Sequence, residues 1–206
     1  MLKRTKGRIL LTLLVVTGFA GTVSNTAPTK EERRVAVDYL KNSKQNLKKD
    51  VKGLSLAQLD YKKSPGSWSV RESYYHIVLS EIEFWKLLEK AMKEPSRPEQ
   101  RSGLGFTDDE LLVKLADRSD KMQSPSHLHP KKAPWKSMED AQAAFKQART
   151  ESLKYMKTTT ADLRNHFVTL PIGRMDCYQF ILYISAHSAR HHEQIAEIIA
   201  HPGFPN

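Results

Sequence analysis

The chain has 206 residues, of which 39% are hydrophobic, with nine glycines, ten prolines and a single cysteine. This length and composition suit one globular domain and exclude a collagen-like, a disulfide-stapled or a largely disordered chain. The net charge is +10, but four of the 33 basic residues lie in residues 1–27, which hold no acidic residue, and the remainder is mixed in sign, so we expect no nucleic-acid partner.

The first 27 residues have the layout of a secretory signal peptide. Basic residues precede an almost uncharged apolar run over residues 9–20, and small residues follow it. The run is shorter than the roughly 20 apolar residues that span a bilayer, which favours cleavage over an uncleaved anchor. We therefore expect an exported protein, periplasmic or secreted, with residues 28–206 as its domain and no stable membrane anchor after cleavage.

Apolar residues recur at helical spacing in five segments, and no segment shows convincing strand alternation. Four of these segments begin with a capping box, in which a Thr, Ser or Asp precedes a Glu or Gln by three residues. The boxes are Thr29 with Glu32, Ser69 with Glu72, Thr107 with Glu110, and Asp176 with Gln179.

The predicted helices have recognisable ends as well as starts. The first is expected to end at Gly53, the second before Pro95, the third, a shorter one, near Met122, and the last near Ala200, while a further helix begins at Ser137. Residues 124–135 form a Pro-rich connector that should be irregular, and residues 170–173 should form a turn. The fold class predicted is all-α: a four-helix bundle with an extra short helix and a Pro-rich connector.

Two of the eight histidines, His187 and His191, lie four residues apart in the last predicted helix. At this spacing both rings project from one face, about 5–6 Å apart at Cβ, near enough to share a metal ion. They interrupt an apolar stripe between Ile184 and Ile195, where buried imidazoles need partners. A chance pair on a partly exposed helix explains the spacing equally well. His192 points about 100° away and is not expected to bind the ion.

His76 lies at the border of the buried face of the second long helix. Should that helix pack beside the last one, three imidazoles would leave an open fourth position, which is typical of a catalytic metal site. A fourth protein ligand, such as His166 or a carboxylate, would make the site structural instead. The H-E-x-x-H motif of zincin peptidases is absent, because Ser188 follows His187.

Two motifs resemble the DinB/YfiT-like superfamily. They are Trp68-Ser69-Val70-Arg71-Glu72 followed by His76 and Glu81, and Gly173-x-Met175 leading into His187-x-x-x-His191-x-x-Gln194-Ile195. The similarity covers about residues 30–200 and implies a four-helix bundle in which His76, His187 and His191 bind a divalent transition metal, zinc or nickel. Relatives include thiol transferases and maleylpyruvate isomerases, which implies a small-molecule substrate, including a thiol as one option. Bundle relatives often pair through helix faces, which allows a homodimer.

The sequence thus predicts an exported metal-dependent hydrolase or transferase. Glu72 and Ser80, each one turn from His76, and Gln194, three residues beyond His191, are candidates for a proton acceptor or an orienting group. The signal peptide departs from the thiol-transferase pattern, because low-molecular-weight thiols are mainly cytosolic reagents. Two alternatives stay open: a stress protein that binds a metal or small ligand without turnover, and a dimerisation module with remnant histidines.

Overall fold

The computed structural model describes residues 27–119 and 123–206. Its long helices are α1 (Lys30–Asp50), α3 (Val70–Ala91), α5 (Met138–Thr158) and α6 (Cys177–Ile199). Shorter elements connect them: the helices α2 (Leu56–Asp60) and α4 (Asp108–Ala116), the 3-10 turns η1 (Pro98–Gly103), η2 (Ser126–Leu128) and η3 (Pro130–Lys132), and the strands β1 (Phe167–Leu170) and β2 (Gly173–Asp176). The predicted all-α four-helix bundle is confirmed.

The N-terminal segment that resembles a signal peptide, residues 1–27, lies outside the described residues except for Ala27. The first described helix, α1, follows directly, with Thr29 as its N-cap. Among the helices that the structure describes, none is long and apolar enough to cross a membrane.

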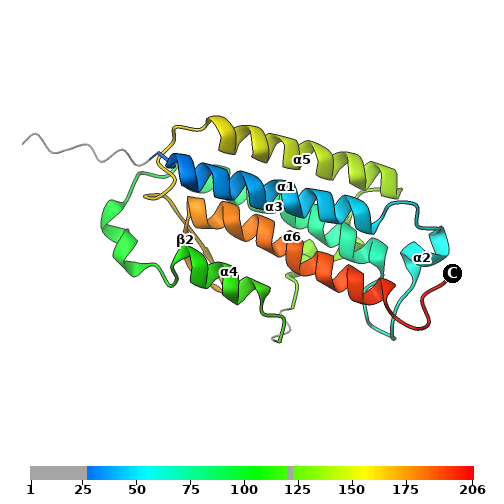
Figure 1. The fold of residues 1–206 in the computed structure, drawn as a ribbon. Helices are drawn as coiled ribbons and strands as arrows, with labels where there is room; N and C mark the ends of the chain where they lie inside the picture. The colour runs from blue at the N-terminus through cyan, green and yellow to red at the C-terminus, as the bar shows by residue number, and fades with distance from the viewer. Residues whose placement is uncertain (1–26, 120–122) are drawn as a thin grey trace, which may run out of the picture.

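The bundle has an up-down-down-up order of helices (Figure 1). Helix α6 packs against α1 and α3, and α5 packs against the same two helices. One end of the core gathers the first halves of α1 and α6 with the last halves of α3 and α5, so α1 and α6 run parallel, as do α3 and α5. The chain must therefore return along the bundle between α3 and α5. This return segment, residues 92–137, contains α4, which packs along α6 (Figure 1).

Local hydrogen bonds start the helices where the sequence predicts. In each of the four predicted capping boxes, the cap side chain accepts the backbone N–H three residues on, and the Glu or Gln there accepts the cap's own N–H. Ser137 caps α5 by accepting the backbone N–H of Asp140. A fifth box, Ser55 with Gln58, starts the short helix α2 that sequence analysis missed.

Three segments differ from the prediction. Helix α4 ends at Ala116 rather than near Met122, because the Asp117 side chain accepts the Ser119 backbone N–H, a local bond that competes with the helix. The Pro-rich connector contains η2 and η3 instead of being irregular throughout. The expected turn at residues 170–173 is the tip of an antiparallel hairpin of β1 and β2, whose four-residue strands are too short to show a clear alternation.

A buried ion pair lies at the middle of the bundle. The guanidinium of Arg149, on α5, is fully buried and donates to both oxygens of Glu81 on α3, at 2.7 and 2.6 Å. Its other N–H groups donate to the Leu40 carbonyl at 3.0 Å, to the Ser43 hydroxyl, and to the Ser188 hydroxyl at 2.9 Å. All five donors of the guanidinium are thus satisfied by groups from α1, α3 and α6. This polar layer separates two apolar clusters of the core.

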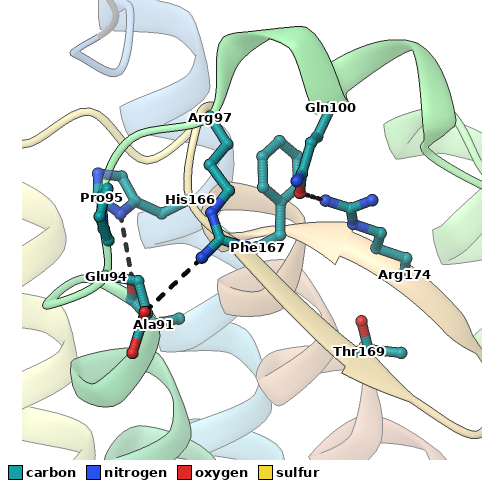
Figure 2. Close-up of a pocket in the computed structure, with 9 residues that line it drawn as sticks. All are labelled: Ala91, Glu94, Pro95, Arg97, Gln100, His166, Phe167, Thr169 and Arg174. Carbon is teal, nitrogen blue, oxygen red and sulfur yellow. Dashed lines mark hydrogen bonds and ion pairs between the residues drawn. The ribbon is translucent and has the colours of Figure 1, made fainter.

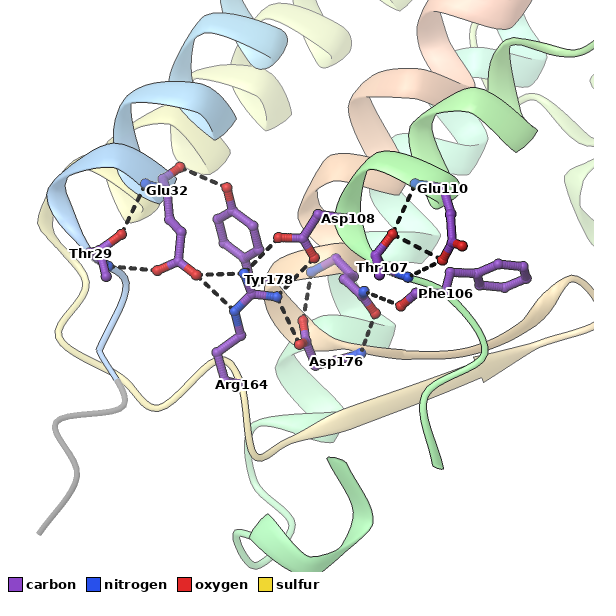
Figure 3. Close-up of polar contacts among 10 residues, drawn as sticks. Thr29, Glu32, Phe106, Thr107, Asp108, Glu110, Arg164, Asp176 and Tyr178 are labelled. Atoms are coloured by element: carbon purple, nitrogen blue, oxygen red, sulfur yellow. Dashed lines mark hydrogen bonds and ion pairs between the residues drawn. The ribbon is translucent and has the colours of Figure 1, made fainter. Parts of the chain in front are cut away.

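A second cation holds the end of the bundle where α1 and α6 begin (Figure 3). Arg164, between α5 and β1, pairs with Glu32 of α1, Asp108 of α4 and Asp176, the N-cap of α6. Its guanidinium carbon also lies 4.1 Å from the centre of the Tyr178 ring. Arg164 therefore joins three helix starts, where acidic side chains are favoured by the helix dipole.

The Glu81→Gln variant should test the buried ion pair. The substitution leaves the Arg149 charge buried without a counter-charge, and we expect it to lower the free energy of unfolding by about 3–5 kcal/mol. Glu83→Gln on the same helix removes an exposed pair with Lys86 and should cost less than about 1 kcal/mol. Urea unfolding of both variants measures the difference, and equal losses would contradict the role of the pair.

Gly173→Ala should destabilise the hairpin. Gly173 has φ +141°, and a Cβ there would lie 2.8 Å from the Phe106 ring, so both the backbone and the packing oppose a side chain. We expect a loss of about 1–3 kcal/mol in the free energy of unfolding. Gly105→Ala is the matched control, because its Cβ meets no atom within 4 Å. Unchanged unfolding midpoints in both variants would be inconsistent with this prediction.

Candidate metal centre

Three histidine side chains converge between α3 and α6. Their ring centres lie 5.2 Å apart for His76 and His187, 4.6 Å for His76 and His191, and 4.7 Å for His187 and His191. One nitrogen of each ring can be chosen so that all three lie within 4.8 Å of one another. Within the described residues, this is the one group of three or more His, Cys, Asp or Glu side chains with such spacing.

The fold explains why these residues meet. His187 and His191 are one turn apart on α6 and share the face that packs on α3. Because α3 runs antiparallel to α6, its first half, which carries His76, lies beside the second half of α6. His76 and His187 are buried, and His191 is half-buried and forms the more open side of the cluster.

Hydrogen bonds orient two of the three rings. Nδ1 of His76 donates to the Leu128 carbonyl at 2.8 Å, since a carbonyl oxygen only accepts. Nδ1 of His191 lies 2.8 Å from Oε1 of Gln194, which also accepts. Both imidazoles therefore carry their proton on Nδ1 and keep the Nε2 lone pair for a ligand, as metal-binding histidines commonly do.

Burial favours the neutral form of the cluster. Loss of hydration lowers the pKa of His76, and it lowers the pKa of His187 well below the usual value. The pKa of His191 falls to about 3, through burial first and the neighbouring charge of His76 second. Neutral imidazole is the form that binds a metal ion, so the cluster fits a divalent transition metal in protonation as well as in spacing.

Aromatic rings surround the cluster. The Trp68 ring centre lies 4.8 Å from that of His76 and 6.2 Å from that of His191. Phe84 packs edge-on against His187, with centres 5.2 Å apart. His129 packs edge-to-face with Trp68, with ring centres 5.9 Å apart, so this residue of the Pro-rich connector lies near the cluster. These rings form part of the wall of the site.

Of the three weaker candidates, Glu72, Ser80 and Gln194, the structure places one in contact with a histidine of the cluster. Gln194 accepts a hydrogen bond from His191, and this contact fixes the orientation of the His191 ring. Ser80 is fully buried one turn after His76, and its hydroxyl has no hydrogen-bond partner among the described residues. Glu72 caps α3 and pairs with Lys62, so its carboxylate is already engaged by these two contacts.

His166, His192 and Cys177 lie outside the cluster. His166, considered as a fourth ligand, is near the opposite end of α3, where its Nδ1 donates to the Ala91 carbonyl at 3.1 Å. His192 points away from the cluster and binds Asp50 on α1. Cys177 is buried, and burial raises the pKa of its thiol to about 12, which keeps it protonated and unreactive.

Sequence analysis missed the contribution of the return segment to the site. The Leu128 carbonyl orients His76, and His129 packs on Trp68. Every residue has a backbone carbonyl, whatever its side chain. The identity of residue 128 therefore does not indicate that its carbonyl accepts a hydrogen bond from His76. Trp68 directly precedes the N-cap Ser69, and an indole at this position is placed to cover the first turn of α3, a signal that indicates a role beside His76.

Comparisons with known proteins agree with the geometry. A family model described as the DinB superfamily matches residues 39–195. Among solved structures, YfiT from Bacillus subtilis is similar, with a TM-score of 0.60 and 16% identity over 86% of this chain and 91% of that chain. YfiT is described as a probable metal-dependent hydrolase with an unusual four-helix bundle topology; at this identity the likeness concerns the fold. A comparison with curated proteins finds no match.

Substitution of single histidines should separate ligands from neighbours. His187→Ala and His191→Ala each remove one of the three converging nitrogens and should abolish stoichiometric zinc or nickel binding after reconstitution. His192→Ala is the control on the same helix, because its ring lies outside the cluster and should leave the metal content unchanged. Elemental analysis of the three variants gives the answer, and equal metal loss in all of them would reject the assignment.

Proposed function

The chain belongs to the DinB superfamily, and we propose that it is an exported metal-dependent hydrolase acting on a small molecule, with one zinc or nickel ion held by His76, His187 and His191. The observation that carries the proposal is the set of three neutral imidazoles with converging nitrogens, two of them buried and one half-buried. Three protein nitrogens leave a position open, which is the pattern of catalytic rather than structural zinc sites.

The residues around the ligands have separate tasks in this proposal. Leu128 and Gln194 hold the rings of His76 and His191 at the angle needed for binding. Trp68 and Phe84 restrict water and strengthen electrostatic interactions inside the site. A divalent ion, when bound, supplies a Lewis acid that lowers the pKa of water and polarises a substrate oxygen.

Export is supported by sequence pattern and by the position of the first helix. The basic and apolar parts of residues 1–27 match a signal peptide. Helix α1 and its N-cap, Thr29, lie beyond this segment, so removal of residues 1–27 would leave the whole described bundle in place. A homodimer remains a prediction from the family resemblance.

Metal content and hydrolysis test the proposal together. The mature protein, purified without a histidine tag, should contain about one equivalent of zinc or nickel, and His76→Ala should contain none. The loaded protein should hydrolyse members of a panel of small esters, amides and lactones, with activity lost on chelation and regained on reloading. His127→Ala, an exposed connector residue, is the control that should keep both properties.

The outcomes separate the alternatives. Absence of metal even after reconstitution would overturn the metal centre and leave the histidines as polar core residues. Metal bound at one equivalent without hydrolysis of any panel member would favour a binding protein without turnover. Conjugation of a thiol to an electrophile in place of hydrolysis would assign the site to a transferase.

A further inference from the structure

A second site lies at the end of the bundle where α3 ends and the hairpin packs. A cavity of about 280 Å³ opens between the loop after α3 and the strands β1 and β2 (Figure 2). Its volume is near the lower limit of ligand pockets, so an occupant must be small. Along α3, Ala91 at the cavity is fifteen residues from His76, which corresponds to roughly 22 Å. A ligand here therefore does not reach the metal centre.

Two arginines, Arg97 and Arg174, line the cavity, and Phe167 and Gln100 lie between them (Figure 2). Arg174, on β2, has no acidic partner among the described residues. Its guanidinium instead donates to the amide oxygen of Gln100 and lies 4.5 Å from the centre of the Phe167 ring. These two contacts hold the guanidinium in place while leaving most of its N–H donors unused, which is a preorganised state for binding an anion.

Arg97 is only weakly engaged by the acidic residue of the cavity. The nearest oxygen of Glu94 lies 3.8 Å away, beyond hydrogen-bond distance, and both side chains are about half exposed, so water screens their attraction. Together Arg97, Arg174 and Glu94 give the lining one net positive charge. This charge complements a monoanion better than a dianion such as phosphate.

We propose that this cavity binds a small organic carboxylate. The planar guanidinium of Arg174 matches the two oxygens of a carboxylate, and Arg97 faces the same space. Ala91, Pro95 and Phe167 offer apolar surface for a short hydrocarbon or aromatic body. The site does not depend on the proposed metal chemistry, and it adds a ligand to a part of the fold remote from the three histidines.

Calorimetric titration of the full-length protein with benzoate tests the site. Benzoate should bind, its neutral analogue benzamide should not bind measurably, and inorganic phosphate should bind more weakly. Arg174→Gln should weaken benzoate binding about tenfold or more, since charge-assisted hydrogen bonds are lost. Arg34→Gln removes an equally charged but exposed residue of α1 and should leave binding unchanged.

The His187→Ala variant distinguishes this site from the metal centre, because carboxylates also bind metal ions. Benzoate binding that persists in His187→Ala supports the cavity, whatever the outcome for the metal. In the unaltered protein, amide signals of residues 91–100 and 166–174 should shift on adding benzoate, a readout that does not need a folded Arg174 variant. Equal binding of benzamide or phosphate, full affinity in Arg174→Gln, or loss in His187→Ala would each overturn the proposal.

Discussion

A buried guanidinium is tolerated in a helical bundle only where acceptors surround it, and this condition fixes the register of the four long helices. Arg149 on α5 finds its acceptors on α1, α3 and α6, so sliding any of these helices by one turn would leave a donor unsatisfied. Ser188, one of the acceptors, directly follows His187. The register that satisfies Arg149 is thus the one that brings α6 to the right height against α3 for the three histidines to meet.

Much of the fold could be predicted from local sequence, because capping boxes and apolar spacing are local signals. The starts of α1, α3, α4 and α6 follow directly from them. The polar layer could not, since Arg149 and Ser152 occupy buried positions of α5 that a search for apolar residues passes over. The hairpin could not be predicted for a different reason. Its strands have only four residues each, and they are stabilised by the packing of Phe106 and by the end of α3 rather than by an alternation of apolar and polar residues.

The part of the candidate metal centre that depends on the geometry of single helices could be predicted from the sequence. The spacing of His187 and His191 predicts a shared face, the place of His76 on the border of a buried helix face makes it a third candidate, and the family resemblance implies the same three residues. The orientation of the rings depends on contacts over long separations, such as the one from His76 to the carbonyl 52 residues later. Such contacts arise because α3 and α5 run in the same direction, so the chain between them must return along the bundle past the site. No local residue pattern indicates the relative direction of these two helices.

The use of a main-chain oxygen to orient His76 has a consequence for how this site can vary. The contact requires no particular side chain, but Leu128 is 3% exposed and belongs to the apolar core, so an apolar residue of similar size at this position would keep the carbonyl in place. Insertion or deletion in the return segment, by contrast, would shift the carbonyl along its path and release the ring. The exposed residues of the return segment can therefore change without moving the His76 ring, provided that position 128 stays apolar and that the number of residues between α3 and η2 is kept.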